Sequence, residues 1–153
     1  MDPLEHASIP TLLYLALSPT PDIVGIVILV AGAVFPDLDA LSREHRSYLH
    51  SLLAFLPAFL TGWYFGGYPY LFVLGWLSHL FLDLFTGVLP FFYPISRKGY
   101  GISVRAVLGL HVPKLSIGIL SAYPTPRRDY ELNLGGSLAL LLLTLLVIIL
   151  RLH

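Results

Sequence analysis

The chain is poor in charge and has no cysteine. Only 12% of its 153 residues are Asp, Glu, Lys or Arg, against about 25% in a typical globular protein. With 56% apolar residues and so few charges, a water-soluble surface could not be covered, and lipid is the predicted solvent. The formal net charge is zero, so no nucleic-acid partner is predicted. The absence of cysteine excludes disulfide frameworks and thiolate metal sites.

Long stretches without charge predict membrane crossings. Residues 47–82 contain no Asp, Glu, Lys or Arg and are interrupted only by a turn-like sequence at 66–69. Because one crossing needs about 20 apolar residues, this stretch predicts two spans joined by a hairpin. Residues 133–150 predict another span, and residues 7–21 and 23–36 predict two short spans in preference to a re-entrant pair. The predicted fold class is therefore all-α, a polytopic membrane bundle of about five helices.

Residues 1–153 are predicted to form a single integral membrane domain. Helices within 1–96 precede a connection at 97–132, and the last span follows in 133–153. The connection has six basic and two acidic residues, and its Gly, Pro and β-branched content predicts short strands or an interfacial cap. Anionic headgroups are its favoured partner, with a phosphate-bearing substrate as the alternative. By the positive-inside rule, this basic side faces the cytoplasm.

Two ionisable side chains lie inside the predicted fourth span, His79 and Asp83. Their spacing of four residues stacks them on one helix face, within reach of a common ion. An intramembrane carboxylate costs roughly 2.5–3.5 kcal/mol on insertion scales, so it requires a partner or a function. An Asp that orients a buried neutral His explains this pair equally well when the pair is considered alone.

Further histidines and carboxylates converge on the same membrane face in the five-span arrangement. His6 begins the first helix there, Asp37 ends the second, and His50 begins the third. The full set of candidate metal ligands is His6, Asp37, Asp39, His45, His50, His79 and Asp83. Nitrogen and oxygen ligands favour Zn²⁺, with Mn²⁺ or Fe²⁺ as alternatives, and seven groups predict two or more ions. A separation above about 10 Å between His79 and Asp37 would be incompatible with a bridged pair of ions.

These motifs resemble the YdjM-like family over residues 1–98. The resemblance rests on four ordered elements: His6, Pro36-Asp37-Leu38-Asp39, His45-Arg46-Ser47-Tyr48-Leu49-His50-Ser51-Leu52, and Gly75-Trp76-Leu77-Ser78-His79-Leu80-Phe81-Leu82-Asp83. The family comprises membrane-bound metal-dependent hydrolases, also described as LexA-binding inner-membrane proteins. The resemblance implies an inner-membrane location, hydrolase activity and a protein partner.

The order His, Pro-Asp-x-Asp, His and His-x-x-x-Asp is also distantly similar to zinc-dependent phospholipase C. This similarity implies metal ligands at His6, Asp37, His50, His79 and Asp83. It leaves Asp39 and His45 as additional ligands or as groups that orient the ligands. Those enzymes use further His and Glu ligands after the last motif, whereas here His111 follows and is predicted to be an interfacial loop residue.

The favoured functional hypothesis is hydrolysis of phosphoesters, including phospholipids or lipid-linked phosphates, at the cytoplasmic face. Metal-activated water attacks phosphorus, Asp37 or Asp39 accepts the proton, and Arg46 contacts a phosphate oxygen. The positive-inside signal accounts equally well for Arg46. A metal-stabilised scaffold that binds a protein partner without turnover is the alternative. An ion or proton transporter has the least support, because the ionisable groups gather at one face.

Overall fold

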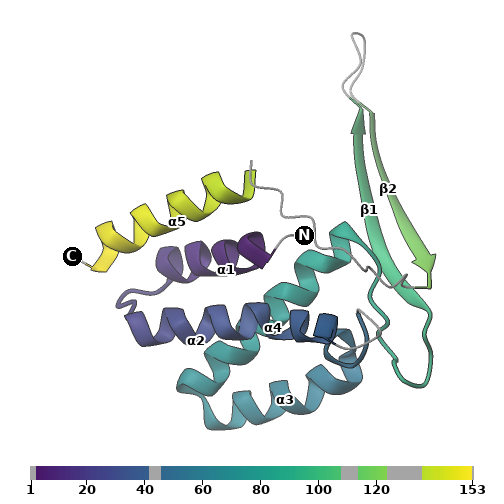
Figure 1. The fold of residues 1–153 in the computed structure, drawn as a ribbon, viewed down its shortest axis with the longest axis horizontal. Helices are drawn as coiled ribbons and strands as arrows, with labels where there is room; N and C mark the ends of the chain where they lie inside the picture. Colours follow the sequence, from purple (N-terminus) through teal and green to yellow (C-terminus); the bar gives the residue numbers. More distant parts are fainter. Residues whose placement is uncertain (1–2, 42–45, 108–113, 124–135, 153) are drawn as a thin grey trace.

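A computed structural model describes residues 3–41, 46–107, 114–123 and 136–152 (Figure 1). This part of the chain contains five α-helices, two short 3-10 helices and one β-hairpin. The elements are α1 (Pro3–Leu17), α2 (Ile23–Val34), η1 (Phe35–Leu41), η2 (Tyr48–His50), α3 (Leu52–Phe65), α4 (Gly67–Thr86), β1 (Gly99–Val107), β2 (Lys114–Ala122) and α5 (Gly136–Leu152). The predicted number of helices is confirmed.

The helices lie side by side in the spatial order α5, α1, α2, α4 and α3 (Figure 1). Successive helices run in opposite directions, because each of the connections after α1, η1 and α3 reverses the chain. The start of α1, the end of η1, the start of α3 and the end of α4 therefore meet at one end of the bundle, called here the site end. The connection between α1 and α2 and the turn between α3 and α4 lie at the far end.

Glycines allow α2 and α4 to cross in close contact. A Cβ added to Gly32 would collide with the carbonyl oxygen of Phe72, and one added to Gly75 would collide with that of Leu29. Small residues at such crossings let helix backbones approach closely and pack by van der Waals contact. His79 lies one turn after Gly75, so this crossing determines which part of α2 the imidazole meets.

A buried hydrophobic cluster packs next to the site end. Phe55, Trp76, Leu80 and Leu89 form a buried cluster drawn from α3, α4 and the segment after α4. The indole Nε1 of Trp76 donates a hydrogen bond of 2.8 Å to the carbonyl of Leu49. This bond fixes η2 on α4 and satisfies the one polar atom that a buried Trp must pair.

A network around Asp22 closes the far end. The Asp22 carboxylate caps α2 by accepting from the Gly25 N–H at 2.8 Å, and it also accepts from the Tyr14 and Tyr68 hydroxyls. The Gly25 hydrogen bond is the main reason why the pKa of Asp22 lies below its ordinary value. Nearby, Arg151 of α5 donates to the carbonyl of Ser18 at 2.9 Å. Four of the helices are thus joined at this end.

Within the described residues, α4 alone is both long and apolar enough to cross a membrane by length and composition. The other apolar helices are shorter, with 14 residues in α3 and 17 in α5. At the N-terminal end, α1 has 15 residues and α2 has 12. Length and composition therefore identify one candidate crossing rather than the five expected.

The segment after α4 forms a β-hairpin, which confirms the short strands expected within 97–132, and the chain is mostly helical with a two-stranded sheet rather than all-α. β1 and β2 pair antiparallel from Gly99 with Ala122 to Val107 with Lys114. Leu89 and Tyr100 exchange two backbone hydrogen bonds of 2.9 Å at the base of the hairpin. Alternation of β-branched side chains with small residues favours strand over helix in this segment.

We expect Gly75→Ala to destabilise the protein by about 1–3 kcal/mol, the usual cost of overpacking. The added methyl group would force α4 away from the carbonyl of Leu29 and would lower the unfolding temperature in detergent. Gly136→Ala is the matched control, because a Cβ there meets nothing within 4 Å. Equal unfolding temperatures for Gly75→Ala and the wild type would contradict the close crossing.

Candidate metal centre

Four elements bring five predicted ligands together at the site end. Two groups of three have ligand atoms that all lie within 4.8 Å of one another: His6, His79 and Asp83, and Asp37, His50 and His79. We call these five residues the His/Asp cluster. α1 supplies His6, η1 supplies Asp37, η2 supplies His50, and α4 supplies the other two. The distance from His79 Nε2 to Asp37 Oδ1 is 3.9 Å, far below the 10 Å limit set above.

The facing nitrogens of His50 and His79 are the central feature of the cluster. Their Nε2 atoms lie 3.2 Å apart. The Nδ1 of His79 lies 2.7 Å from the carbonyl of Ala33, which can only accept, so Nδ1 carries the hydrogen and Nε2 presents a lone pair. The Nδ1 of His50 lies 3.1 Å from Asp39 Oδ2 and donates to that carboxylate in the same way. When both rings are neutral, two lone pairs face each other, and a bound cation between them would stabilise this arrangement.

This spacing suits two ligands of one metal ion. Zn–N bonds of 2.0–2.1 Å in tetrahedral geometry separate two ligand nitrogens by about 3.3 Å. The other contacts within the cluster fall in the same range. Asp83 Oδ1 lies 3.4 Å from His6 Nε2, and Asp83 Oδ2 lies 3.6 Å from His50 Nε2 and 3.8 Å from His79 Nε2.

Unpartnered buried atoms give a separate test of whether these residues fit a metal. Four buried side-chain atoms lack a hydrogen-bond partner in the described part of the chain, and two of them, His6 Nδ1 and Asp37 Oδ2, belong to the cluster. Native proteins seldom leave buried polar atoms unpaired, so each such atom requires an explanation. A divalent ion supplies one here, because imidazole nitrogen and carboxylate oxygen are its usual ligands.

Asp39 lies behind His50 and belongs to neither group of three. Its Oδ2 accepts from the backbone N–H groups of Ser47 at 2.9 Å and Leu49 at 3.0 Å, as well as from His50. Burial alone would raise the pKa of Asp39, but these hydrogen bonds outweigh burial and hold its pKa below the ordinary value. The geometry therefore makes Asp39 the carboxylate that orients His50.

Asp37 differs from Asp39 in its environment. Burial is the largest influence and raises the pKa of the Asp37 carboxyl above its ordinary value, although His6 and His50 oppose this rise. Its Oδ1 faces His79, while its Oδ2 has no hydrogen-bond partner among the described residues. Asp37 therefore has a buried oxygen that no described residue pairs.

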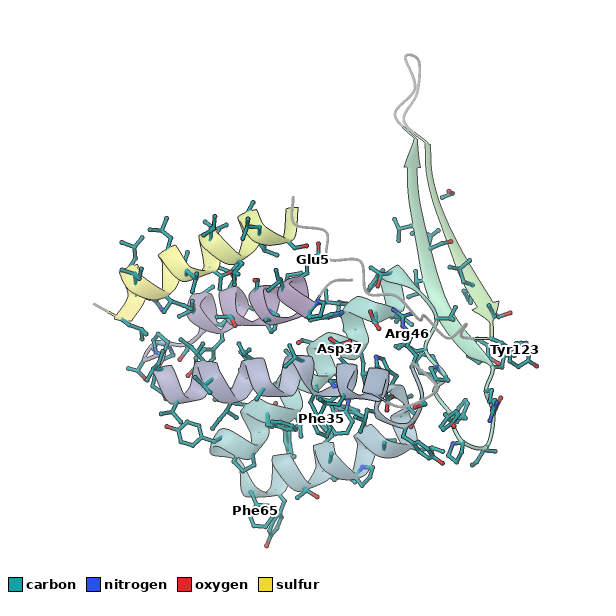
Figure 2. All side chains as sticks on the ribbon, viewed as in Figure 1. Glu5, Phe35, Asp37, Arg46, Phe65 and Tyr123 are labelled. Carbon is teal, nitrogen blue, oxygen red and sulfur yellow. The ribbon has the colours of Figure 1, made fainter. Side chains whose placement is uncertain are left out.

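Arg46 supplies the cationic side of the site. Its guanidinium contacts Asp83 Oδ2 at 2.9 Å and donates to the carbonyl of Val88 at 3.3 Å. The residue has a positive φ of 60°, which is uncommon for a side chain other than glycine. A Cβ at Gly87 would collide with this guanidinium, so Gly87 leaves the space that Arg46 occupies. Figure 2 shows Asp37 and Arg46 close together at the site end, beside the base of the hairpin.

Two residues named from the sequence, His45 and His111, lie outside the described part of the chain. Other contributors were not anticipated from the sequence. The Ala33 carbonyl fixes the tautomer of His79, and Gly87 makes room for Arg46. The glycines near the His-x-x-x-Asp motif were a signal that could have indicated close packing, whereas nothing in the sequence identifies a particular backbone carbonyl.

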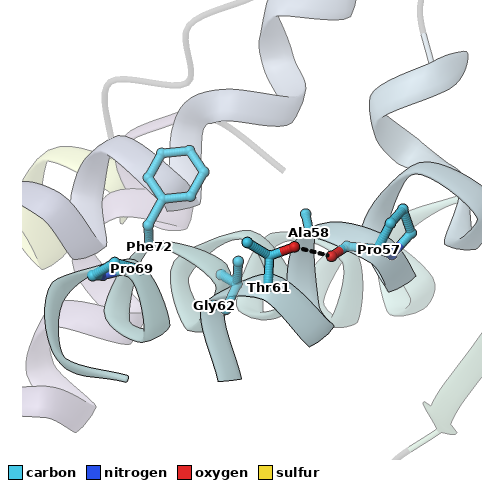
Figure 3. A pocket seen from close by; sticks show the side chains of 7 residues that line it. Pro57, Ala58, Thr61, Gly62, Pro69 and Phe72 are labelled. Carbon is cyan, nitrogen blue, oxygen red and sulfur yellow. Dashed lines mark hydrogen bonds between the residues drawn. The ribbon is translucent and has the colours of Figure 1, made fainter. Parts of the chain in front are cut away.

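An apolar groove between α3 and α4 is separate from the cluster (Figure 3). It has a volume of about 410 Å³ and is lined by Pro57, Ala58, Thr61, Gly62, Pro69, Phe72 and Val73. The Thr61 hydroxyl donates a hydrogen bond of 2.8 Å to the carbonyl of Pro57, the proline inside α3. None of the lining residues is ionisable, and we assign this groove no chemical role.

The sequence matches the family model described as YdjM inner membrane protein over residues 1–152. The predicted resemblance is thus confirmed, and it extends through the hairpin and α5, beyond the motifs on which it was based. No curated protein and no solved structure matches the chain. The similarity to zinc-dependent phospholipase C stays a prediction.

We expect the purified protein to contain a divalent metal that His79→Ala removes. His79 belongs to both groups of three, so its loss disrupts either arrangement. Metal content per chain can be measured by elemental analysis in detergent. Asp22→Asn is the matched control, because it changes a carboxylate at the far end and keeps an oxygen that can cap α2. Equal metal content in the wild type and His79→Ala would contradict the assignment.

We expect Asp39→Asn to weaken metal affinity by about 10- to 100-fold, as is typical when the group that orients a histidine ligand is changed. The amide oxygen can still accept from Ser47 and Leu49, so the local fold should persist. Competition with a coloured chelator measures the affinity, and circular dichroism checks the fold. A smaller loss for His79→Ala than for Asp39→Asn would reverse the roles given to these residues.

Proposed function

The chain belongs to the YdjM inner membrane protein family, and on this basis we propose that it is a membrane-bound, metal-dependent hydrolase of phosphoesters. The observation that carries this proposal is the pair of His50 and His79 Nε2 atoms, 3.2 Å apart with both tautomers fixed. This arrangement prepares two neutral nitrogen ligands in advance. Asp37, Asp83 and His6 then complete a set rich in carboxylate, with more groups than a closed structural zinc site requires.

Charge balance supports a divalent ion. If the imidazoles are neutral and the carboxylates ionised, Asp37, Asp39 and Asp83 carry three negative charges, and Arg46, which contacts Asp83, carries one positive charge among the described residues of the site. The excess of two negative charges matches one Zn²⁺, Mn²⁺ or Fe²⁺, with Zn²⁺ favoured by the ligand set. A second ion would have to share Asp83, whose Oδ1 faces His6 while its Oδ2 faces His50 and His79.

The residues divide the work of hydrolysis by position. A bound divalent ion supplies Lewis acidity and lowers the pKa of water towards neutrality. Asp37 Oδ2 is the free buried oxygen beside the ligands and accepts the proton from the attacking water. Asp39 holds the ring of His50, and the Ala33 carbonyl holds that of His79. The rings of His50 and His79 therefore keep their positions when the charge of the site changes during the reaction.

Arg46 gives the site its preference for phosphate. Its planar guanidinium presents several N–H donors, which suit the oxygens of a phosphate group. In the absence of substrate it contacts Asp83 and Val88, so it is held at the edge of the cluster rather than in bulk water. Phosphoesters, including phospholipids and lipid-linked phosphates, are the proposed substrates.

We further propose a multi-pass arrangement in which the site end faces the cytoplasm. Basic residues 97–98 lie on the approach to the hairpin, next to the site end, and basic residues 105 and 114 lie on its two strands. The positive-inside rule places such residues on the cytoplasmic side. The exposed apolar surfaces of α3, α4 and α5, which include Leu60, Phe81 and Leu142, suit contact with lipid.

A metal-stabilised scaffold is the second candidate, because α1, η1, η2 and α4 each contribute to the cluster. An ion bound there would hold four parts of the chain together, and metal binding would then contribute to folding stability without turnover. A protein partner, as the family description implies, would use the surface of such a scaffold.

Hydrolysis assays on chromogenic phosphomonoesters and phosphodiesters test the proposed function. We expect turnover by the metal-loaded wild type, loss of turnover in His79→Ala, and normal turnover in Asp22→Asn. Arg46→Gln should retain metal but raise KM by about 10- to 100-fold, the size expected for loss of one or two charge-assisted hydrogen bonds. Inside-out membrane vesicles should hydrolyse an impermeant ester, and right-side-out vesicles should not.

Metal bound at full occupancy without turnover on either ester class would favour the scaffold. Hydrolysis by protein from which a chelator has removed the metal would contradict both candidates.

A further inference from the structure

The β-hairpin has one face of β-branched side chains, called here the aliphatic face, and an opposite face on which small residues accompany Leu120. In the observed register, Ile102 pairs with Ile119 and Val104 pairs with Ile117. Directly paired residues share a face, and neighbours along a strand alternate, so these four β-branched side chains form one surface. Gly101, Ser103 and Gly118 lie on the opposite face, where the Ser103 hydroxyl donates to the carbonyl of Gly118 at 3.3 Å.

The aliphatic face is open in the described part of the chain. Val104 is 53% exposed, Ile117 is 70% exposed and Ile119 is 83% exposed. A two-stranded hairpin is marginal in water without a further layer against its apolar face. The helical bundle supports only the base, through the bridge between Leu89 and Tyr100 and the contact of Gly101 with Gly87. Among the described residues, nothing covers the aliphatic face beyond the base of the hairpin.

The direction of the hairpin indicates which surface is within reach. Figure 1 shows β1 and β2 running crosswise to α1, α2 and α5, at the site end of the bundle. When the helix axes lie along the membrane normal, the hairpin extends along the bilayer plane. It extends past α1 and α5, and so lies over lipid rather than over its own helices (Figure 1).

We propose that the aliphatic face of the hairpin rests in the headgroup region of the bilayer and that anionic lipids are its partner. Apolar side chains at this level gain from burial at the boundary between headgroups and acyl chains. Lys98, whose Nζ lies 5.7 Å from the ring centre of Tyr100, sits where the hairpin begins. The 97–132 segment carries six basic and two acidic residues, and each Lys or Arg near an anionic surface adds about 1 kcal/mol of attraction.

Charge also favours lipid over a second copy of the chain. Two copies that covered each other's aliphatic faces would bring two positively charged segments together, and this repulsion would oppose pairing. At the base of the hairpin the opposite face, through Gly101, lies against Gly87, and the strong twist of two-stranded ribbons turns the aliphatic face towards the bilayer further along the strands. This proposal rests on the multi-pass arrangement proposed above and does not rest on the proposed hydrolysis.

Site-directed spin labelling of the full chain tests this proposal cleanly, because the protein has no native cysteine. Val104→Cys and Ile117→Cys report on the aliphatic face, and Ser103→Cys is the matched control on the opposite face of the same strand. The labelled proteins are reconstituted in vesicles of phosphatidylcholine with phosphatidylglycerol. Accessibility is measured to oxygen, which concentrates in lipid, and to a neutral nickel chelate, which stays in water.

We expect the ratio of oxygen to nickel accessibility to be several-fold higher at positions 104 and 117 than at position 103. The difference should shrink in vesicles of phosphatidylcholine alone and in the Arg97→Gln, Lys98→Gln double variant. Equal ratios on the two faces in anionic vesicles would overturn the proposal. Spin–spin broadening at position 117 that disappears on dilution with unlabelled protein would overturn it in favour of a second copy.

Discussion

The hydrogen bond from His79 to the carbonyl of Ala33, at 2.7 Å, is the interaction on which the cluster depends. It exists because Gly32 and Gly75 let α2 and α4 touch backbone to backbone, one turn before His79 on α4. The bond fixes the tautomer, and the tautomer aims Nε2 at His50, Asp83 and Asp37. Larger residues at the crossing of α2 and α4 would move the His79 ring and break its contacts with His50, Asp83 and Asp37.

Burial gives the cluster its chemical character. The side chains of His6, His50, His79 and Asp83 are almost fully inaccessible to water. Ionised groups in such surroundings are costly unless they are paired, because the protein interior screens charge poorly. Arg46 meets part of this requirement through Asp83, and in each group of three the ligand atoms lie within 4.8 Å of one another. The same low polarity strengthens every electrostatic interaction with a bound cation.

The sequence predicted the convergence of the cluster better than the form of the fold. Spacing placed His79 and Asp83 on one helix face, and the alternating direction of the helices brought His6, Asp37 and His50 to the same end. The resemblance left Asp39 open between a ligand and an orienting group, because two carboxylates in Pro-Asp-x-Asp look alike until backbone N–H groups of Ser47 and Leu49 are seen to hold one of them. Hydropathy overestimated helix lengths, since apolar runs continue through turns, and the hairpin required pairing between residues that are distant along the chain.

The short helices have a consequence for the lipid around this protein. α1 has 15 residues and α2 has 12, or about 22 Å and 18 Å at 1.5 Å per residue, against a hydrocarbon thickness of about 30 Å. In the proposed multi-pass arrangement, such mismatch is relieved when the surrounding leaflets become thinner. Thinning lowers the polar heads of nearby lipids towards the level of the imidazoles. A lipid phosphate could then meet the site by lateral diffusion, with its acyl chains still dissolved in the membrane.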